Sequence, residues 1–332
     1  GVVLQIGNRI EVLRDDGLPV RVIFDKVPPN MRADPTLSIT LQGKAGTREA
    51  ALRYLTPGLG WRADYVALYD EAKSTIDVQG WVTLTNNSGT TYDNARTVLV
   101  AGSPRMLNQG YDNYNRGNPG MVEAGTESGT RERLGDYYLY PLAERTTIAN
   151  LQTKQVSFLD VHGAPAQHGY EISFGWLQTS DTPLSAATMY SFTNSSQGGL
   201  GDQLPAGIVR FYIKDSRGQA QFIGERGIGH TPMGSKLAIS TGDAFDVKVQ
   251  PVVEARTKVN DRRWKTQMRY TLTNALPKPV TVNMIQSGLW GDTKVAEESL
   301  KSTRRDADSV VWAVTVPANG KTVVTATFDS KY

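Results

Sequence analysis

Residues 61–102 read WRADYVALYDEAKSTIDVQGWVTLTNNSGTTYDNARTVLVAG, and this stretch decides the fold class. Small or apolar residues occupy every second position of its middle part: Ile76, Val78, Gly80, Val82 and Leu84. A period of two is typical of a β-strand with one buried face. The polar run at 86–89 favours a turn, and the apolar run at 98–101 resembles a second strand. We therefore expect a hairpin here.

The rest of the chain continues in the same way. Two apolar runs, Ile208–Lys214 and Gln219–Ile223, flank the turn-forming residues 215–218, which end in glycine and predict another hairpin. No convincing helical period is sustained anywhere in the chain. The sequence therefore predicts an all-β fold.

The length of 332 residues predicts two or more domains, since a domain holds roughly 150 residues. From residue 235 onward short alternating stretches follow one another, and Phe245, Val247 and Val249 form one of them. Their size and spacing match an immunoglobulin-like sandwich. We therefore expect two or more β-sandwich-like domains, with residues 235–332 forming an immunoglobulin-like one.

Residues 1–234 are expected to form an N-terminal β domain with two long loops, at about 103–135 and 179–207, where the apolar pattern disappears. One short sequence pattern is repeated in the two predicted domains. The stretch that ends in Leu84-Thr85-Asn86 recurs in form as the one that ends in Leu272-Thr273-Asn274. We interpret it as an asparagine that closes the same kind of hairpin in two related β-sandwich domains, and chance resemblance of a six-residue string is the alternative.

Composition excludes several classes of function. The 36 basic residues nearly balance the 33 acidic ones, and they do not cluster, so a nucleic-acid partner is not expected. The chain has no cysteine, which excludes disulfides and thiol catalysis. No apolar run approaches the length of a transmembrane segment. The residues after Gly1 lack the features of a signal peptide, and we expect that such a segment preceded them.

Several short motifs stand out in order along the chain: Tyr54–Tyr65, Leu84–Gly89, Lys154–Val156, Leu204–Gly207, Phe222–Glu225, Gly229–Gly234 and Ala244–Val247. Together they resemble a bacterial family labelled domain of unknown function 4139, whose longer relatives include mucoidy-inhibitor-like proteins. The family has no established enzymatic activity. The resemblance implies a protein of the bacterial envelope, periplasmic or extracellular.

No catalytic signature stands out. Asp160, His162 and His168 offer three ligands, and imidazole and carboxylate suit zinc or copper, but the residues between them are typical of a turn, so we predict no metal site and no cofactor. The chain has no His-Glu-x-x-His pair, no Gly-x-Ser-x-Gly elbow and no phosphate loop.

Two groups of residues are candidate sites. In the first, Glu225, Arg226 and His230 lie among glycines near the predicted domain junction, where a Glu-Arg pair can be structural or part of an active site. The second is a loop rich in side chains that suit recognition surfaces, and disorder is its alternative. Its candidate binding residues are Tyr111, Tyr114, Arg116, Arg131, Arg133 and Tyr137.

We therefore predict a non-enzymatic envelope or secreted β-sandwich protein that binds a protein or glycan partner through its long loops. One alternative is a hydrolase of an envelope polymer that uses Glu225, Asp243 or His230. The other is a structural subunit of an oligomer or filament.

Overall fold

The computed structural model describes residues 2–7, 9–13, 21–24, 39–40, 42–43, 46–47, 49, 51–102, 121–128 and 131–331. All regular elements in these parts are β-strands, which confirms the all-β prediction. Within them, no helix is long and apolar enough to cross a membrane. The chain divides into two compact units, Gly1–Tyr54 and Leu55–Tyr332. The boundary predicted at 234/235 therefore falls inside the second unit.

The first unit contains a small antiparallel sheet. Its strands are β1 (Val2–Ile6), β2 (Arg9–Leu13) and β3 (Arg21–Phe24), with β2 in the middle.

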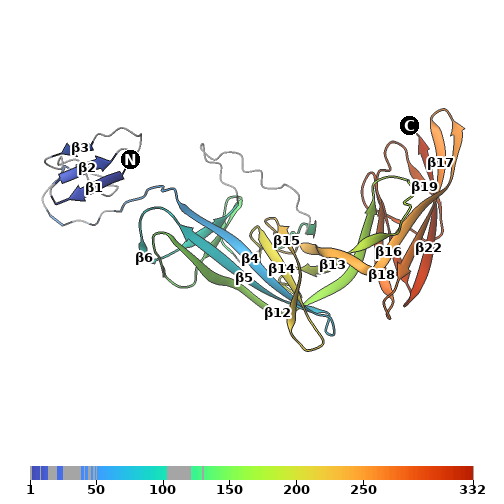
Figure 1. Cartoon of the computed structure of the whole chain (residues 1–332), viewed down its shortest axis with the longest axis horizontal. Coiled ribbons are helices and arrows are strands. Elements are labelled where there is room, and N and C mark those ends of the chain that lie inside the picture. Colours follow the sequence, from blue (N-terminus) through green and yellow to red (C-terminus); the bar gives the residue numbers. More distant parts are fainter. Residues whose placement is uncertain are drawn as a thin grey trace. The chain divides into compact units, whose positions relative to one another are not determined.

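The second unit is organised around one large mixed sheet (Figure 1). Its first five strands, in spatial order, are β15 (Ala220–Ile228), β14 (Gly207–Lys214), β4 (Leu59–Asp70), β5 (Thr75–Asn86) and β12 (Gln152–Phe174). β14 runs parallel to β4, and the other neighbours are antiparallel. The alternation predicted in β5 is confirmed, because Ile76, Val78, Val82 and Leu84 are at most 4% exposed. The hairpin predicted at 208–223 is confirmed as β14 and β15.

The predicted hairpin between the strand at 76–84 and the apolar run at 98–101 is wrong, because the hairpin in this stretch joins β4 to β5. Both edges of β5 are occupied, one by β4 and the other by β12. β7 (Val98–Ala101) therefore pairs elsewhere, in a three-stranded sheet with β10 (Tyr137–Pro141) and β9 (Arg133–Leu134). A further pair joins β6 (Tyr92–Ala95) to β11 (Thr146–Ile148).

The large sheet continues from β12 through five more strands. They are β13 (Leu184–Thr193), β16 (Lys236–Asn260), β17 (Arg263–Asn274), β22 (Gly320–Lys331) and β19 (Lys294–Glu298). Other strands of the sheet pair outside this order. β18 (Val280–Gln286) pairs with β12 and with β21 (Val310–Val316), β20 (Thr303–Arg304) pairs with β21, and β8 (Met121–Glu123) pairs with β16. β13 lies inside the stretch 179–207 that was expected to be a loop. Its polar residues alternate with the buried Ala186, Tyr190 and Phe192, so the low apolar content concealed a strand with one buried face.

Three apolar clusters fill the second unit. One lies under β4, β5 and β14 and includes Tyr65 and Phe211, and a smaller one beside it includes Leu84 and Tyr140. The third lies among β16, β17, β18, β21 and β22, around Trp312. β12, β13 and β16 contribute to both the first and the third, because these long strands run from one to the other.

The repeated Leu-Thr-Asn pattern has a structural basis. Asn86 is buried at the end of β5, and its amide donates to the carbonyls of Thr90, Ile148 and Ala149. Asn274 is buried at the end of β17 and donates in the same way to three carbonyls. In each case the side-chain oxygen accepts the backbone N–H two residues later. Both asparagines therefore hold their turns in the same way, but the expectation that each closes a hairpin is wrong, because β5 pairs with β4 and β12, and β17 pairs with β16 and β22.

Candidate functional site

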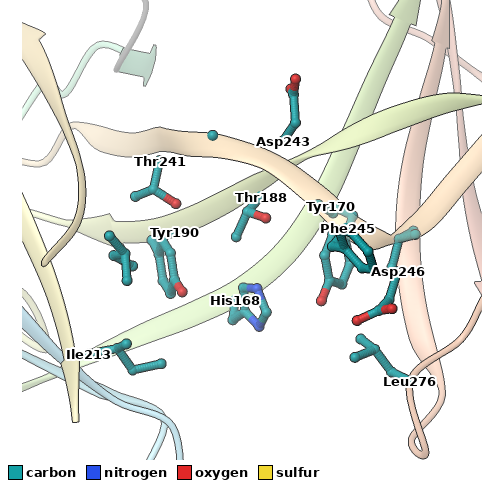
Figure 2. A pocket seen from close by; sticks show the side chains of 14 residues that line it. His168, Tyr170, Thr188, Tyr190, Ile213, Thr241, Asp243, Phe245, Asp246 and Leu276 are labelled. Carbon is teal, nitrogen blue, oxygen red and sulfur yellow. The ribbon is translucent and has the colours of Figure 1, made fainter. Parts of the chain in front are cut away.

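The strongest candidate site is a hollow between the first and third apolar clusters, with a cavity volume of about 350 Å³ (Figure 2). This volume lies at the lower end of the range for small-molecule sites, roughly 300–1,000 Å³. Its walls come from β12, β13, β14, β15 and β16. We call it the aromatic hollow, because four of its lining side chains are rings: His168, Tyr170, Tyr190 and Phe245.

A bulge in β16 forms one side of the aromatic hollow. Lys248 is paired with Ser185, and Asp243 is paired with Ala187. Between these pairs β13 has the single residue Ala186, whereas β16 has residues 244–247, which is three more. A bulge of this kind redirects side chains, and bulges are common beside functional sites.

The bulge explains why the alternation predicted through Phe245 is wrong. Val247 and Val249 are fully buried as expected, but Phe245 is 88% exposed. It lines the aromatic hollow and also a second hollow, of about 480 Å³, on its other side. Phe245 therefore stands at the rim between two depressions.

The floor of the aromatic hollow is a row of packed rings. His168 stacks on Tyr190 with ring centroids 5.0 Å apart and an interplanar angle of 17°. On its other side it meets Tyr170 edge to face at 5.1 Å. Tyr190 also stacks on the buried Phe211, at 5.5 Å. The row therefore runs from the first apolar cluster to the third, and it holds His168 in place between them.

His168 has an unsatisfied polar atom. Its Nε2 is buried and has no hydrogen-bond partner within the described residues. Burial lowers the pKa of His168, against the raising effect of Glu71, so the ring is neutral at pH 7. A buried polar atom without a partner is costly, by roughly 1–3 kcal/mol.

The two tyrosines are also uncharged at neutral pH. Burial, together with the nearby Glu71 and Asp246 carboxylates, raises the pKa of Tyr170. Burial raises the pKa of Tyr190 to about 12, and neighbouring Tyr69 adds to the effect. The charge of the lining is therefore carried by its carboxylates.

Two aspartates, Asp243 and Asp246, are among the residues that line the aromatic hollow, and no lysine or arginine is. Neither carboxylate makes an ion pair or side-chain hydrogen bond to any described residue. In Figure 2 the carboxylate of Asp246 points toward Leu276 and Tyr170, whereas Asp243 points away from the rings. Close by, Glu71 and Lys278 form an ion pair with each other. The site is therefore acidic on balance.

The structure describes three of the six predicted binding residues. Tyr111, Tyr114 and Arg116 lie outside the described residues. Arg131 is held in the fold: its Nε donates to both carboxylate oxygens of Asp202, at 2.8 and 2.9 Å, and its guanidinium lies 4.3 Å from the centre of the Tyr140 ring.

The other two predicted binding residues lie beside the small sheet that contains β10. Arg133 is on β9, and its guanidinium lies 5.6 Å from the centre of the Tyr138 ring. Tyr137 is partly buried at the start of β10. It covers Gly102, where a Cβ atom would stand 2.3 Å from its ring. Neither residue lines the aromatic hollow.

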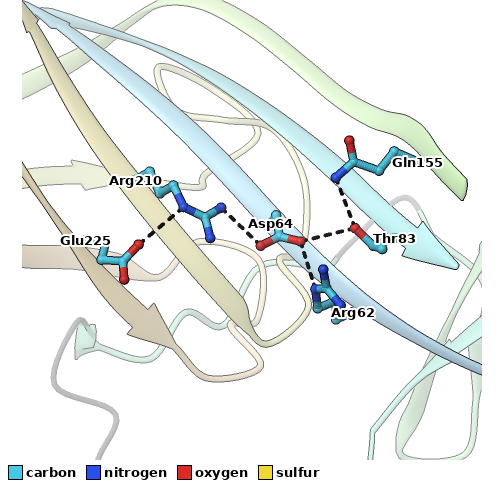
Figure 3. A network of polar contacts seen from close by, with 6 residues as sticks. All are labelled: Arg62, Asp64, Thr83, Gln155, Arg210 and Glu225. Carbon is cyan, nitrogen blue, oxygen red and sulfur yellow. Dashed lines mark hydrogen bonds and ion pairs between the residues drawn. The ribbon is translucent and has the colours of Figure 1, made fainter. Parts of the chain in front are cut away.

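The predicted junction residues are also separate from the hollow. Glu225 lies on β15 and pairs with Arg210 of β14 at 3.2 Å, and Arg210 also pairs with Asp64 of β4 at 3.1 Å (Figure 3). Arg226, the next residue on β15, is exposed. The Nδ1 of His230 accepts the backbone N–H of Ala206 at 3.1 Å. Among the described residues no hydrogen bond or ion pair joins Glu225 to His230.

The three potential metal ligands of the sequence do not converge. His162 lies 3.6 Å from Asp77 and 3.3 Å from Asp160, while His168 occupies the aromatic hollow. Across the described parts of the chain, no group of three or more His, Cys, Asp or Glu side chains is placed to hold a metal ion.

Sequence reasoning missed the aromatic hollow because strands distant in sequence build it. Residues 241–247, Thr-Gly-Asp-Ala-Phe-Asp-Val, carry one local signal: a glycine beside two aspartates interrupts an otherwise apolar strand, and an isolated glycine in a strand suggests a bulge.

No known family model matches the chain, and no curated protein is similar to it in sequence.

Proposed function

We propose that this protein is a binding protein whose ligand occupies the aromatic hollow. The observation that carries this proposal is the placement of Phe245, which a three-residue bulge holds 88% exposed at the rim of a cavity lined by aromatic rings. Burying a phenylalanine stabilises a protein by about 1.5–3 kcal/mol, so a ligand that covers it gains from its burial.

Single exposed apolar residues are common on protein surfaces, and exposure alone indicates nothing. Phe245 differs because two features coincide around it, the bulge and the hollow. A ligand in the hollow would cover the phenyl ring. These features support a binding site built into the scaffold rather than one carried only by the loops.

The wider setting of the proposal rests on the sequence. The ordered motifs that resemble the domain of unknown function 4139 family favour a bacterial envelope or secreted protein. The size and spacing of the last strands favour an immunoglobulin-like sandwich around Trp312. The hydrolase alternative has less support, because Glu225 is paired with Arg210 and neither it nor His230 lines the hollow. Its third candidate, Asp243, does line the hollow, but its carboxylate points away from the rings (Figure 2). In this proposal the protein binds its partner without chemical change.

The test uses three probes of nearly the same shape: choline, its neutral analogue 3,3-dimethyl-1-butanol, and the anion 3,3-dimethylbutyrate. Methyl resonances of Ile213, Ile223 and Leu276, which line the hollow, report binding in a labelled sample of the whole chain. We expect saturable shifts with at least one probe. The shifts should be lost in Phe245→Ser and kept in Phe222→Ser, a matched control that removes another exposed phenylalanine, 54% exposed, outside the lining. No saturable shift with any probe would overturn the proposal.

A further inference from the structure

We infer that the ligand of the aromatic hollow is an organic cation, meaning an ammonium or quaternary ammonium group on an apolar body. This inference rests on the proposed function and specifies its ligand class. It depends on the charge of the lining and on the rings that face the cavity.

The lining favours positive charge. Asp243 and Asp246 are the charged residues of its lining, since His168 is neutral and no lysine or arginine contributes, and of the two only the Asp246 carboxylate points toward the rings (Figure 2). Both carboxylates lack a counter-ion within the described residues. Among the described residues, Lys278 acts electrostatically on His168, and it is already paired with Glu71. A cation entering the hollow therefore gains a carboxylate partner, whereas an anion is repelled.

The rings favour the same class of ligand. Cations are attracted to the faces of tyrosine and phenylalanine rings, and aromatic cages bind quaternary ammonium groups in this way. Tyr170 and Phe245 line the cavity, and the Asp246 carboxylate points toward Tyr170 (Figure 2). The hollow thus combines aromatic surface with an unpaired carboxylate at one end, and these are the two features that an organic cation requires.

The neutral state of His168 fits this ligand. A protonated imidazole would place a positive charge at the floor of the hollow and oppose a bound cation. The groups that face this ring are the uncharged Tyr170 and Tyr190, with Glu71 and Lys278 acting on it through space. Because burial lowers its pKa, the ring stays neutral at pH 7 and does not compete with the ligand.

The test measures the affinities of the three probes for the whole chain by the same methyl shifts. We expect choline to bind at least about tenfold more tightly than 3,3-dimethyl-1-butanol, and the anion most weakly. Asp246→Asn should remove most of the difference between choline and the alcohol, whereas Asp292→Asn, on an exposed turn outside the lining, should leave it unchanged. Thermal unfolding of each variant confirms that it is folded.

The outcomes separate the two proposals. Equal affinity for choline and the alcohol, or preference for the anion, would overturn the cation inference and leave the binding site standing. Binding of no probe would overturn both. A comparison of choline with the blocked amino acid Nα-acetyl-lysine methylamide distinguishes a free small molecule from a lysine side chain of a partner, according to which binds more tightly.

Discussion

The buried pair between Arg131 and Asp202 allows a direct test of whether Arg131 belongs to the scaffold rather than to a free binding loop. The two side chains are only 19% and 12% exposed. Asp202→Ala would leave the guanidinium without its counter-ion beside the Tyr140 ring. Breaking a buried pair by removing one partner costs about 3–5 kcal/mol, and we expect the lower end because Arg131 keeps some contact with water.

The matched control is the pair between Lys236 and Glu123. Its separation is 2.8 Å, but its side chains are 67% and 65% exposed. Exposed pairs contribute roughly 0–1 kcal/mol, so Glu123→Ala should cost less than about 1 kcal/mol. Burial is thus the main difference between the two pairs.

The assay is urea unfolding followed by tyrosine and tryptophan fluorescence. With an m value of about 3 kcal/mol/M, Asp202→Ala should lower the urea midpoint by about 1 M, and Glu123→Ala by less than about 0.3 M. Equal and small shifts in the two variants would refute the reasoning. Arg131 would then be free to bind a partner, as its sequence context suggested.

Three further results are expected. Asn86→Ala and Asn274→Ala should each lower the free energy of unfolding by about 3 kcal/mol in urea titrations, because each leaves buried carbonyls without their donor. Gly288→Ala should be destabilising in thermal unfolding, since φ is +73° and the new Cβ would stand 2.0 Å from the carbonyl oxygen of Gly175; an unchanged midpoint would contradict this. The lowered pKa of His168 means that the unfolded chain takes up the proton first, so its stabilising effect is complete above about pH 6.5 and is lost as the pH falls through the folded pKa. The urea midpoint should therefore fall less on acidification in His168→Asn than in the wild type.

The sequence pattern correctly predicted the features that depend on a single strand and not on the strands that pair with it. The alternation in β5 identified its buried face, because a period of two reflects only the geometry of the strand itself. The repeated Leu-Thr-Asn pattern also reflects local structure. Asn86 and Asn274 donate hydrogen bonds to the turns that directly follow them, as well as to carbonyls from elsewhere.

Pairing and the aromatic hollow could not be predicted in this way. The strand at 98–101 follows β5 in sequence, but β12 occupies the edge it would need. Phe245 continues the alternation of Val247 and Val249, and only the pairing of β16 with β13 shows the extra residues that turn it outward. The hollow itself requires five strands that the sequence separates widely.

The most direct test of the central claim is an intermolecular nuclear Overhauser measurement on the whole chain with choline. The trimethylammonium protons give one sharp signal, which makes contacts to assigned ring protons easy to identify. We predict contacts to the rings of Tyr170 and Phe245, which disappear when excess tetramethylammonium is added. Contacts only to an exposed ring elsewhere, such as Trp290, which is 59% exposed, would contradict the account.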